Sequence, residues 1–335
     1  PFLTFRSIQL GRTYGCGVSV AKQMYCWGRV NGNTLQAIPA AVTFTPPTTV
    51  NTVATGERHH CMTTPSGLAF CTGTNDEGEL GNGTTTTAAN YAAVTPPPTT
   101  WSMIAAGSLH TCGMPRYSGA GTVKPFCWGF NSSGQIGDGT TVTKLIPTAV
   151  TLPALVTELD STSLVVGAAH SCAIVSAGTS LSSPVGSVLC WGSNGYGQLG
   201  TAVAFTSTSF SNIAVAAAPL LTFTSLTAGE YHTCGVTTTG QAYCWGRNSS
   251  GQLGDGTLTN TSTPVLVGGS LTWRSLSAGE LFTCGVAGTV TGGGTTAGAG
   301  TIYCWGDNEY GQLGTGTSSG NSNPLRTPQR VSFQP

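Results

Sequence analysis

Twelve cysteines form the clearest chemical pattern in this sequence. They occur as successive pairs, separated by 10 to 20 residues: Cys16 and Cys26, Cys61 and Cys71, Cys112 and Cys127, Cys172 and Cys190, Cys234 and Cys244, and Cys284 and Cys304. The stretch "CGVTTTGQAYC" is typical of a hairpin with glycine in its turn, which places its two cysteines on facing strands at bridging distance. We therefore expect six disulfides, one in each pair.

Two other roles for the cysteines, as reduced core thiols or as zinc ligands, fit this pattern less well. Reduced thiols are readily buried in a core, but every cysteine here has a partner at a comparable spacing. Zinc sites use short Cys-x-x-Cys or Cys/His spacings, and these are absent, so we expect no metal and no cofactor. Disulfides in this number persist only in an oxidising compartment. The cysteines thus predict an extracellular or cell-surface protein.

Four histidines stand two positions before a paired cysteine: His59, His110, His170 and His232. They suggest a ring of metal ligands, but Tyr14 and Phe282 hold the same position in the other two copies. A position that accepts aromatic residues is typical of a structural role. We expect each imidazole to be hydrogen-bonded inside its own repeat. His60 is the one histidine outside this position.

Three glutamates, Glu57, Glu230 and Glu280, follow an Ala-Gly or Thr-Gly turn. They are either solvated loop residues or a partner-facing loop that could also hold a cation. No repeat combines a nucleophile with a base, and there is no Gly-x-Ser-x-Gly element and no P-loop. We therefore expect no catalytic residues and interpret the chain as no enzyme.

Asn-x-Ser/Thr sequons occur at Asn82, Asn131, Asn248 and Asn260. Three of them lie in a recurrent polar turn or just after it, where a sugar could be accommodated. The alternative is that Asn-Ser-Ser-Gly is simply favourable turn sequence. We predict N-glycosylation of at least one sequon if the chain passes through a eukaryotic secretory route.

A repeated motif positions all of these residues. The segment "YCWGRNSSGQLGDGT" (243–257) recurs in six variants whose second cysteines are 45, 56, 63, 54 and 60 residues apart. Upstream segments such as "TFTSLTAGEYHTCGV" alternate apolar and small residues and break at glycine, which predicts strands. Each repeat is predicted to be a small antiparallel sheet, with one strand before the Ala-Gly turn, one through each cysteine and a weaker one near segments such as "TPVLV".

Six small sheets cannot each bury a face alone, so radial packing in a propeller is the expected solution. The repeats would span about 1–47, 48–98, 99–153, 154–219, 220–268 and 269–335 of one domain, 1–335. In this arrangement the motif tryptophan packs between neighbouring sheets, and its glycines allow close approach or positive φ.

The combination of "AGxxHTCGV", "YCWGxNxxGQLGDGT" and a downstream Pro-x-x-Val resembles the regulator of chromosome condensation (RCC1) repeat over essentially the whole chain. The resemblance implies an all-β RCC1-like β-propeller. That family generally has seven blades, whereas six repeats are present, so either six blades close the ring or one is missing or supplied from elsewhere. Members of this family have dissimilar functions: nucleotide exchange on a small GTPase, ultraviolet sensing, inhibition of β-lactamase and scaffolding. The fold therefore says little about function.

The composition excludes several partners. Charged residues make up 7% of the chain and the formal net charge is zero, compared with a typical charged share of roughly a quarter. Because no Lys/Arg cluster is present, we expect no nucleic-acid binding, and without a run of about 18 apolar residues we expect no membrane insertion. The chain opens without methionine or a leader, so we expect a processed or trimmed chain.

These observations favour a non-enzymatic, extracellular or cell-surface propeller that acts as a disulfide-stabilised structural or interaction module. Its partner would be a protein or a glycan. Its neutral surface would also suit self-assembly, as a glycosylated subunit of a surface fibre or sheath. The alternative is a soluble regulator that binds an enzyme or a small GTPase through one propeller face. A third hypothesis is an enzyme with a carboxylate-lined central site.

Overall fold

The structure is a computed structural model that describes residues 3–30, 34–44, 49–95, 98, 100–116, 123–154, 156–178, 184–217, 221–288, 300–318 and 324–332. Regular structure within these ranges consists of β-strands. No described helix has the length and apolar character that crossing a membrane requires. The predicted repeat boundaries at 47–48, 98–99 and 219–220 lie wholly or partly outside the described residues.

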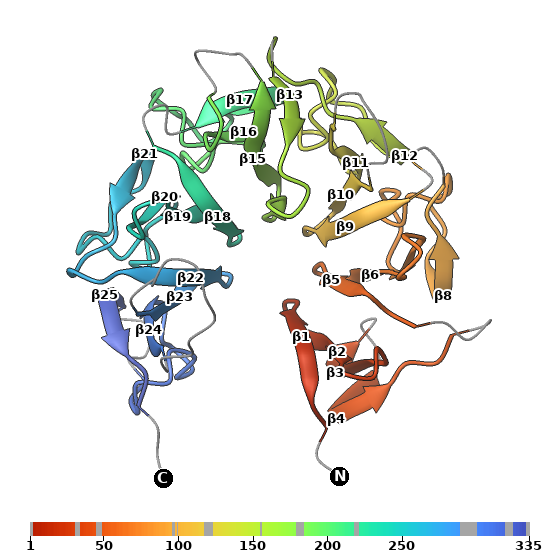
Figure 1. Cartoon of the computed structure of the whole chain (residues 1–335), viewed down its shortest axis with the longest axis horizontal. Coiled ribbons are helices and arrows are strands. Elements are labelled where there is room, and N and C mark those ends of the chain that lie inside the picture. The colour runs from red at the N-terminus through yellow and green to blue at the C-terminus, as the bar shows by residue number, and fades with distance from the viewer. Residues whose placement is uncertain are drawn as a thin grey trace. The chain divides into compact units, whose positions relative to one another are not determined.

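The first three sheets each contain four antiparallel strands (Figure 1). The second and third strands of each sheet lie at its centre. The strands are β1 (Phe5–Leu10), β2 (Tyr14–Ser19), β3 (Met24–Val30) and β4 (Thr34–Ala41), then β5 (Thr52–Thr55), β6 (His59–Thr63), β7 (Ala69–Gly73) and β8 (Ala88–Ala93), then β9 (Trp101–Ala106), β10 (His110–Pro115), β11 (Phe126–Gly129) and β12 (Lys144–Ala149).

The fourth sheet has the order β13-β15-β16-β17, with β14 paired to β15, and the last two sheets repeat the four-stranded pattern. The strands are β13 (Val156–Leu159), β14 (Val165–Val166), β15 (His170–Gly178), β16 (Val188–Ser193) and β17 (Phe210–Ala217), then β18 (Phe223–Ala228), β19 (His232–Thr237), β20 (Ala242–Gly246) and β21 (Thr261–Leu266), then β22 (Trp273–Ala278), β23 (Phe282–Ala287), β24 (Thr301–Gly306) and β25 (Leu325–Arg330).

The chain forms two compact units. Unit 1 comprises Pro1–Leu152, Thr157–Ala169 and Ser211–Ala214, and unit 2 comprises Pro153–Val156, His170–Phe210 and Val215–Pro335. The first three sheets therefore lie in unit 1, whereas β15, β16 and the last two sheets lie in unit 2.

The core of each unit lies between neighbouring sheets. In unit 1 one cluster joins the Cys61 and Cys71 sulfurs of the second sheet to Trp101 and Trp128 of the third. In unit 2 a matching cluster joins the fifth sheet to Trp273 and Trp305 of the sixth. Since a small sheet alone leaves one face in water, stacking sheets buries both faces and the inner strands become fully buried. The motif tryptophans Trp128 and Trp305 therefore pack between sheets, as predicted.

The polar turn of the motif is organised by one buried asparagine. In the third sheet Asn131 Oδ1 accepts a hydrogen bond from the Ile136 amide at 2.9 Å, and its Nδ2 donates to the Thr140 and Val142 carbonyls at 3.2 and 3.1 Å. The amide group thus satisfies backbone groups that the turn takes away from a strand ladder. Gly134 has a φ of +71°, which an L side chain rarely adopts.

Candidate functional site

Six disulfides join the two central strands of each sheet, and they are the six predicted pairs. In the first sheet Cys16 lies directly opposite Cys26 in the antiparallel register, and the other sheets repeat this arrangement. The chain has no free cysteine. The hairpin spacing in the sequence was a sufficient guide because antiparallel pairing fixes which residues face each other.

Neighbouring sheets are joined through one shared backbone carbonyl. In unit 2 the Gln198 carbonyl accepts hydrogen bonds from Thr233 Oγ1 at 3.0 Å and from Trp245 Nε1 at 2.9 Å. The Gln252 carbonyl accepts from Thr283 and Trp305 in the same way. In unit 1 the Glu79 carbonyl has this role for Thr111 and Trp128, both at 2.8 Å. We call this arrangement the shared-carbonyl junction.

The repeat histidines belong to the same junction. His170 Nε2 lies 2.9 Å from Thr233 Oγ1, and His232 and His59 make the equivalent contact with the threonine of the following sheet. The prediction that each imidazole is bonded inside its own repeat was therefore wrong for these three. It failed because the alternation of a strand shows which side a residue faces, but not which neighbouring sheet covers that side.

The junction also fixes the histidine tautomer. The single hydroxyl proton of Thr233 goes to the Gln198 carbonyl, so the hydroxyl oxygen must accept the proton on His170 Nε2. Nδ1 is then unprotonated, and it is buried without a hydrogen-bond partner. Burial lowers the pKa of His170 to about 4 and, with the charge of His170 as a second cause, lowers the pKa of His232 to about 3. These imidazoles stay neutral at physiological pH.

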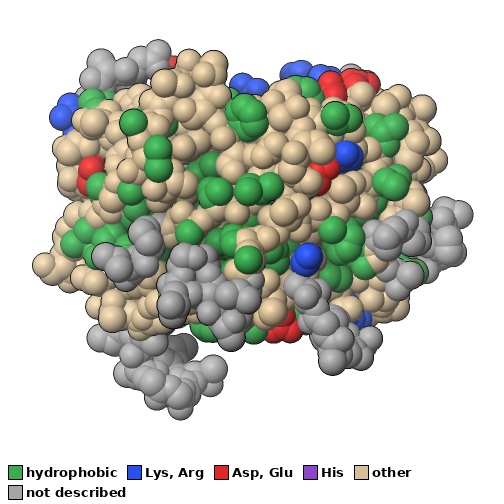
Figure 2. All heavy atoms as spheres, turned by 90° about the horizontal axis from the view of Figure 1, so that it is seen from above, with side chains coloured by type: hydrophobic (Ala, Val, Ile, Leu, Met, Phe, Trp, Pro, Cys, Tyr) green, Lys and Arg blue, Asp and Glu red, His purple; other side chains and the backbone are tan. Residues whose placement is uncertain are grey.

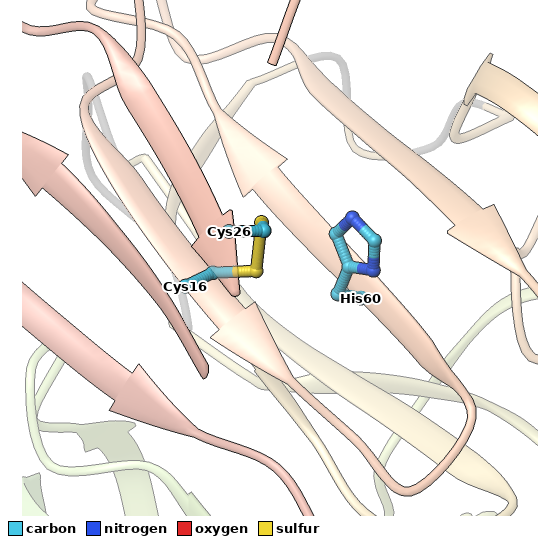
Figure 3. Close-up of side chains that lie close together, drawn as sticks. All are labelled: Cys16, Cys26 and His60. Carbon is cyan, nitrogen blue, oxygen red and sulfur yellow. A yellow bond between two sulfur atoms is a disulfide. The ribbon is translucent and has the colours of Figure 1, made fainter. Parts of the chain in front are cut away.

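His60 lies beside the disulfide of the first sheet (Figure 3). Its ring nitrogen and the Sγ atoms of Cys16 and Cys26 lie within 4.8 Å of one another. Metal binding by cysteine requires thiolates, whereas these two sulfurs are bonded to each other. His60 Nε2 is instead 2.7 Å from the Tyr91 hydroxyl. This group is therefore a packed structural cluster.

The structure separates the four sequons into two kinds. Asn131 and Asn248 are fully buried, and their Nδ2 atoms, the sites of sugar attachment, donate hydrogen bonds within the turn. A sugar at either residue would displace these buried hydrogen bonds, so we expect none at Asn131 or Asn248. Asn82 and Asn260 are half-buried, and glycosylation at these two positions stays a prediction.

The three predicted loop glutamates belong to different units, Glu57 to unit 1 and Glu230 and Glu280 to unit 2. In unit 1 the Glu57 carboxylate pairs with Arg12 of the first sheet at 2.8 Å. In unit 2 the Glu230 amide lies 3.4 Å from the Glu280 carbonyl, so the loops that carry these two glutamates are adjacent. An ion pair at the protein surface contributes little free energy. The partner-facing role of these three glutamates stays a prediction.

Glu230 belongs to a surface cluster that also contains Tyr231, Tyr196 and Arg247. The Arg247 amide donates to the Tyr231 carbonyl at 2.9 Å, which holds the loop before β19 against the turn after β20. The Tyr196 and Tyr231 ring centroids are 5.1 Å apart. The Arg247 guanidinium lies 5.3 Å from the first ring centroid and 5.8 Å from the second. We call these four residues the tyrosine–arginine cluster.

The contacts and electrostatics of this cluster hold its side chains in place. Burial, together with the charge of Glu230 and a hydrogen bond to it, raises the pKa of Tyr231, so its phenol stays protonated. Arg247 is held by both rings and by Ser249 Oγ at 2.9 Å. Half-buried tyrosine and arginine side chains are the residue types that dominate protein-binding hot spots.

Sequence analysis missed Tyr196, Tyr231 and Arg247. A signal existed, since these residues vary between copies of an otherwise regular motif: serine replaces Tyr196 at Ser133 and Ser250. A motif position that varies between copies is typical of a side chain that faces solvent and is not needed for packing. Figure 2 shows only small groups of charged side chains on the face that it draws, in line with the 7% of charged residues in the chain.

Six antiparallel sheets with a repeated junction define an all-β protein of the β-propeller class. Two models of the regulator of chromosome condensation (RCC1) repeat match this chain, one at residues 162–198 and 223–252 and the other at residues 125–174, 239–286 and 299–335. The chain belongs to the RCC1 repeat family.

Two relatives in sequence and one solved structure illustrate what this chain is similar to. The chain is 28% identical over 270 residues to the human probable E3 ubiquitin-protein ligase HERC6, covering 76% of this chain and 24% of HERC6. It is 26% identical over 273 residues to the Arabidopsis thaliana ultraviolet-B receptor UVR8, covering 79% and 58%. Prp20p of Saccharomyces cerevisiae, studied for binding to Gsp1p and histones, superposes with a TM-score of 0.78 at 18% identity, covering 98% and 76%. This chain thus spans about a quarter of HERC6.

Proposed function

We propose that this chain is a non-enzymatic interaction module of an extracellular or cell-surface protein, which binds a protein partner through the tyrosine–arginine cluster. The observation that carries the proposal is that all twelve cysteines are paired in six disulfides at equivalent positions. Each closes a loop of 10 to 20 residues and is worth about 3 kcal/mol in the chain-entropy model. Such cross-links persist in an oxidising compartment.

The compartment is tested on protein isolated from its natural source. The native protein is alkylated without reduction and its intact mass is measured, with a fully reduced and unfolded sample as the control. We expect no cysteine to alkylate before reduction. Alkylation of all twelve thiols would overturn the extracellular proposal and would favour the alternative, a soluble intracellular regulator of an enzyme or a small GTPase.

The binding surface is tested with Arg247→Ala and Tyr231→Ala. Truncating a central arginine or tyrosine in a protein interface typically costs about 2 kcal/mol or more, which is roughly a 30-fold loss of affinity. Arg330→Ala is the matched control, because Arg330 is an exposed arginine of β25 in the same unit. The partner is isolated by cross-linking from the natural source. Equal affinity of all three variants would place the partner elsewhere.

A finer part of the proposal is that the module is a glycosylated subunit of a surface fibre or sheath. It is supported by the formal net charge of zero and the 7% of charged residues, since copies with uncharged surfaces pack side by side without mutual repulsion. Glycan binding is the alternative to a protein partner. Electron microscopy of native material tests this part, because fibres should be labelled by antibody against this chain.

A further inference from the structure

The first sheet has one face that differs from its equivalents in the other sheets. Ile8 and Leu10 of β1 are 49% and 70% exposed. Trp27 is half-buried, whereas Trp128, Trp245 and Trp305 are fully buried. We call Ile8, Leu10, Gly15 and Trp27 the receiving face. Among the described residues none accepts a hydrogen bond from Trp27 Nε1.

The receiving face has lost the threonine of the shared-carbonyl junction. Leu10 pairs with Gly15, whereas Ala228 pairs with Thr233 at the same register in the fifth sheet. A Cβ at Gly15 would lie 2.8 Å from the Trp27 ring and 3.0 Å from the Leu10 side chain. The leucine and the indole therefore fill the space that threonine occupies elsewhere. The result is a continuous apolar surface with one N–H donor.

The last repeat carries the opposite half of the same junction. Its turn Gly311–Gly314 matches the turns that supply the shared carbonyls, but Gln312 is half-buried, whereas Gln198 and Gln252 are fully buried. We call this turn the acceptor turn. Among the described residues no group donates to the Gln312 carbonyl.

The surroundings of the acceptor turn are open. A Cβ at Gly254 would lie 2.6 Å from Trp305 Nε1, whereas the nearest atom to a Cβ at Gly314 is Val331 Cγ1 at 3.2 Å. A Cβ at Gly251 would lie 3.0 Å from the Arg326 Cα, whereas one at Gly311 would have nothing within 4 Å. Within the part of the chain that the structure describes, the glycines that permit close approach of a following sheet are therefore present here without that sheet.

The histidine of the junction is absent on this side as well. Phe282 holds the position of His232 and is half-buried, whereas His232 is fully buried. A phenylalanine cannot donate to a threonine, and the receiving face offers none. The two exposed surfaces have thus lost the same hydrogen bond and both present apolar groups in its place. They match each other better than either matches an internal surface.

We propose that the receiving face of one copy binds the acceptor turn of a second copy, with Trp27 Nε1 donating to the Gln312 carbonyl. This contact repeats the chemistry of three internal junctions, and each copy carries one surface of each kind. A head-to-tail contact leaves a free surface at both ends, so it continues into a ring or a filament. The inference rests on the fibre part of the proposed function and gives it a mode of assembly.

The experiment uses the full chain and sedimentation velocity from about 1 µM to about 1 mM, a range that covers weak specific association. Leu10→Glu places a charge in the receiving face. Gly311→Asn places a side chain where another sheet would lie, and asparagine tolerates the φ of +76° at this position. Leu68→Glu is the control, since Leu68 is an apolar residue of unit 1 with 49% exposure, as Ile8 has.

The wild type and Leu68→Glu should increase in mass with concentration, while Leu10→Glu and Gly311→Asn should each stay monomeric, with a dissociation constant at least about tenfold higher. An equimolar mixture of the two variants should stop at a dimer, because it retains one intact surface of each kind. Unchanged circular dichroism verifies folding.

A wild type that is monomeric at about 1 mM overturns the inference, and so does a mixture that forms no dimer. Either result leaves the thiol measurement and the Arg247 measurement untouched, so failure here is distinct from failure of the proposed module. Conversely, alkylatable cysteines would overturn the proposed compartment without changing the oligomeric state.

Discussion

Acidification should unfold this protein because its histidines are buried as neutral groups. Burial lowers the pKa of His59 and His232 to about 3, and of His60 and His170 to about 4. An unfolded histidine has a pKa near 6.5. Between these values the unfolded chain binds more protons than the folded chain. The stability that these neutral histidines contribute is therefore fully present above about pH 6.5. It is lost progressively as the pH falls from there toward the folded-state pKa.

The magnitude follows from the number of such groups. At pH 5, which is about 1.5 units below the unfolded pKa, each neutral imidazole lowers the free energy of unfolding by about 2 kcal/mol. Unit 1 contains His59 and His60, and unit 2 contains His170 and His232. Each unit should therefore lose about 4 kcal/mol between pH 7 and pH 5, which is a large part of a typical domain stability of about 5–15 kcal/mol.

Guanidinium unfolding at pH 7, 6 and 5 with the disulfides intact measures this loss. His60→Thr is the informative variant, because threonine occupies the equivalent position of other repeats at Thr111, Thr233 and Thr283. It should lower stability at pH 7, where it loses the bond to Tyr91, yet lose about 2 kcal/mol less than the wild type on acidification. A free energy of unfolding that is constant from pH 7 to pH 5 would refute the reasoning.

Three further changes test the junction and the turns. Burial raises the pKa of Glu79 and makes its charged form costly. Glu79→Gln should therefore raise the free energy of unfolding by about 1 kcal/mol at pH 7 and should not raise it at pH 4. Equal effects at both pH values would contradict this. Thr233→Val leaves the proton of His170 Nε2 without an acceptor, so denaturant titration should show a loss of about 1–3 kcal/mol; no loss would mean that the contact is not a hydrogen bond. After secretion from a glycosylating host, peptide mapping should find no sugar on Asn131 and should find one on Asn82 or Asn260, and a sugar on Asn131 would rule out the buried turn.

The disulfides show where the sequence is a sufficient guide. Cys234 and Cys244 are joined by a short hairpin, so local turn chemistry brings their strands together, and antiparallel register then fixes the partner. The same local argument gave the strands, since alternation and glycine breaks are properties of consecutive residues. The family resemblance extended these local predictions to the sequence of sheets.

The sequons show where local pattern misleads. Asn131 and Asn82 carry the same Asn-x-Ser/Thr signal, and only the path of the turn determines that Asn131 is buried while Asn82 stays half-exposed. Asn131 is buried within the turn that it organises, where its Nδ2 reaches the Val142 carbonyl 11 residues along the chain. A single sequence contains no record of that contact.

The sequence by itself determined the strands, the cysteine pairing and the repeated motif, because each depends on residues that are close in the chain. The tertiary structure decided which sheet each exposed strand face meets. It assigned the Thr233 hydroxyl to the Gln198 carbonyl across 35 residues, and it brought Tyr196, Tyr231 and Arg247 together from two different sheets. It also left the faces at Leu10 and Gln312 uncovered among the described residues. These outcomes depend on how sheets stack, and stacking is decided by the packing of whole surfaces.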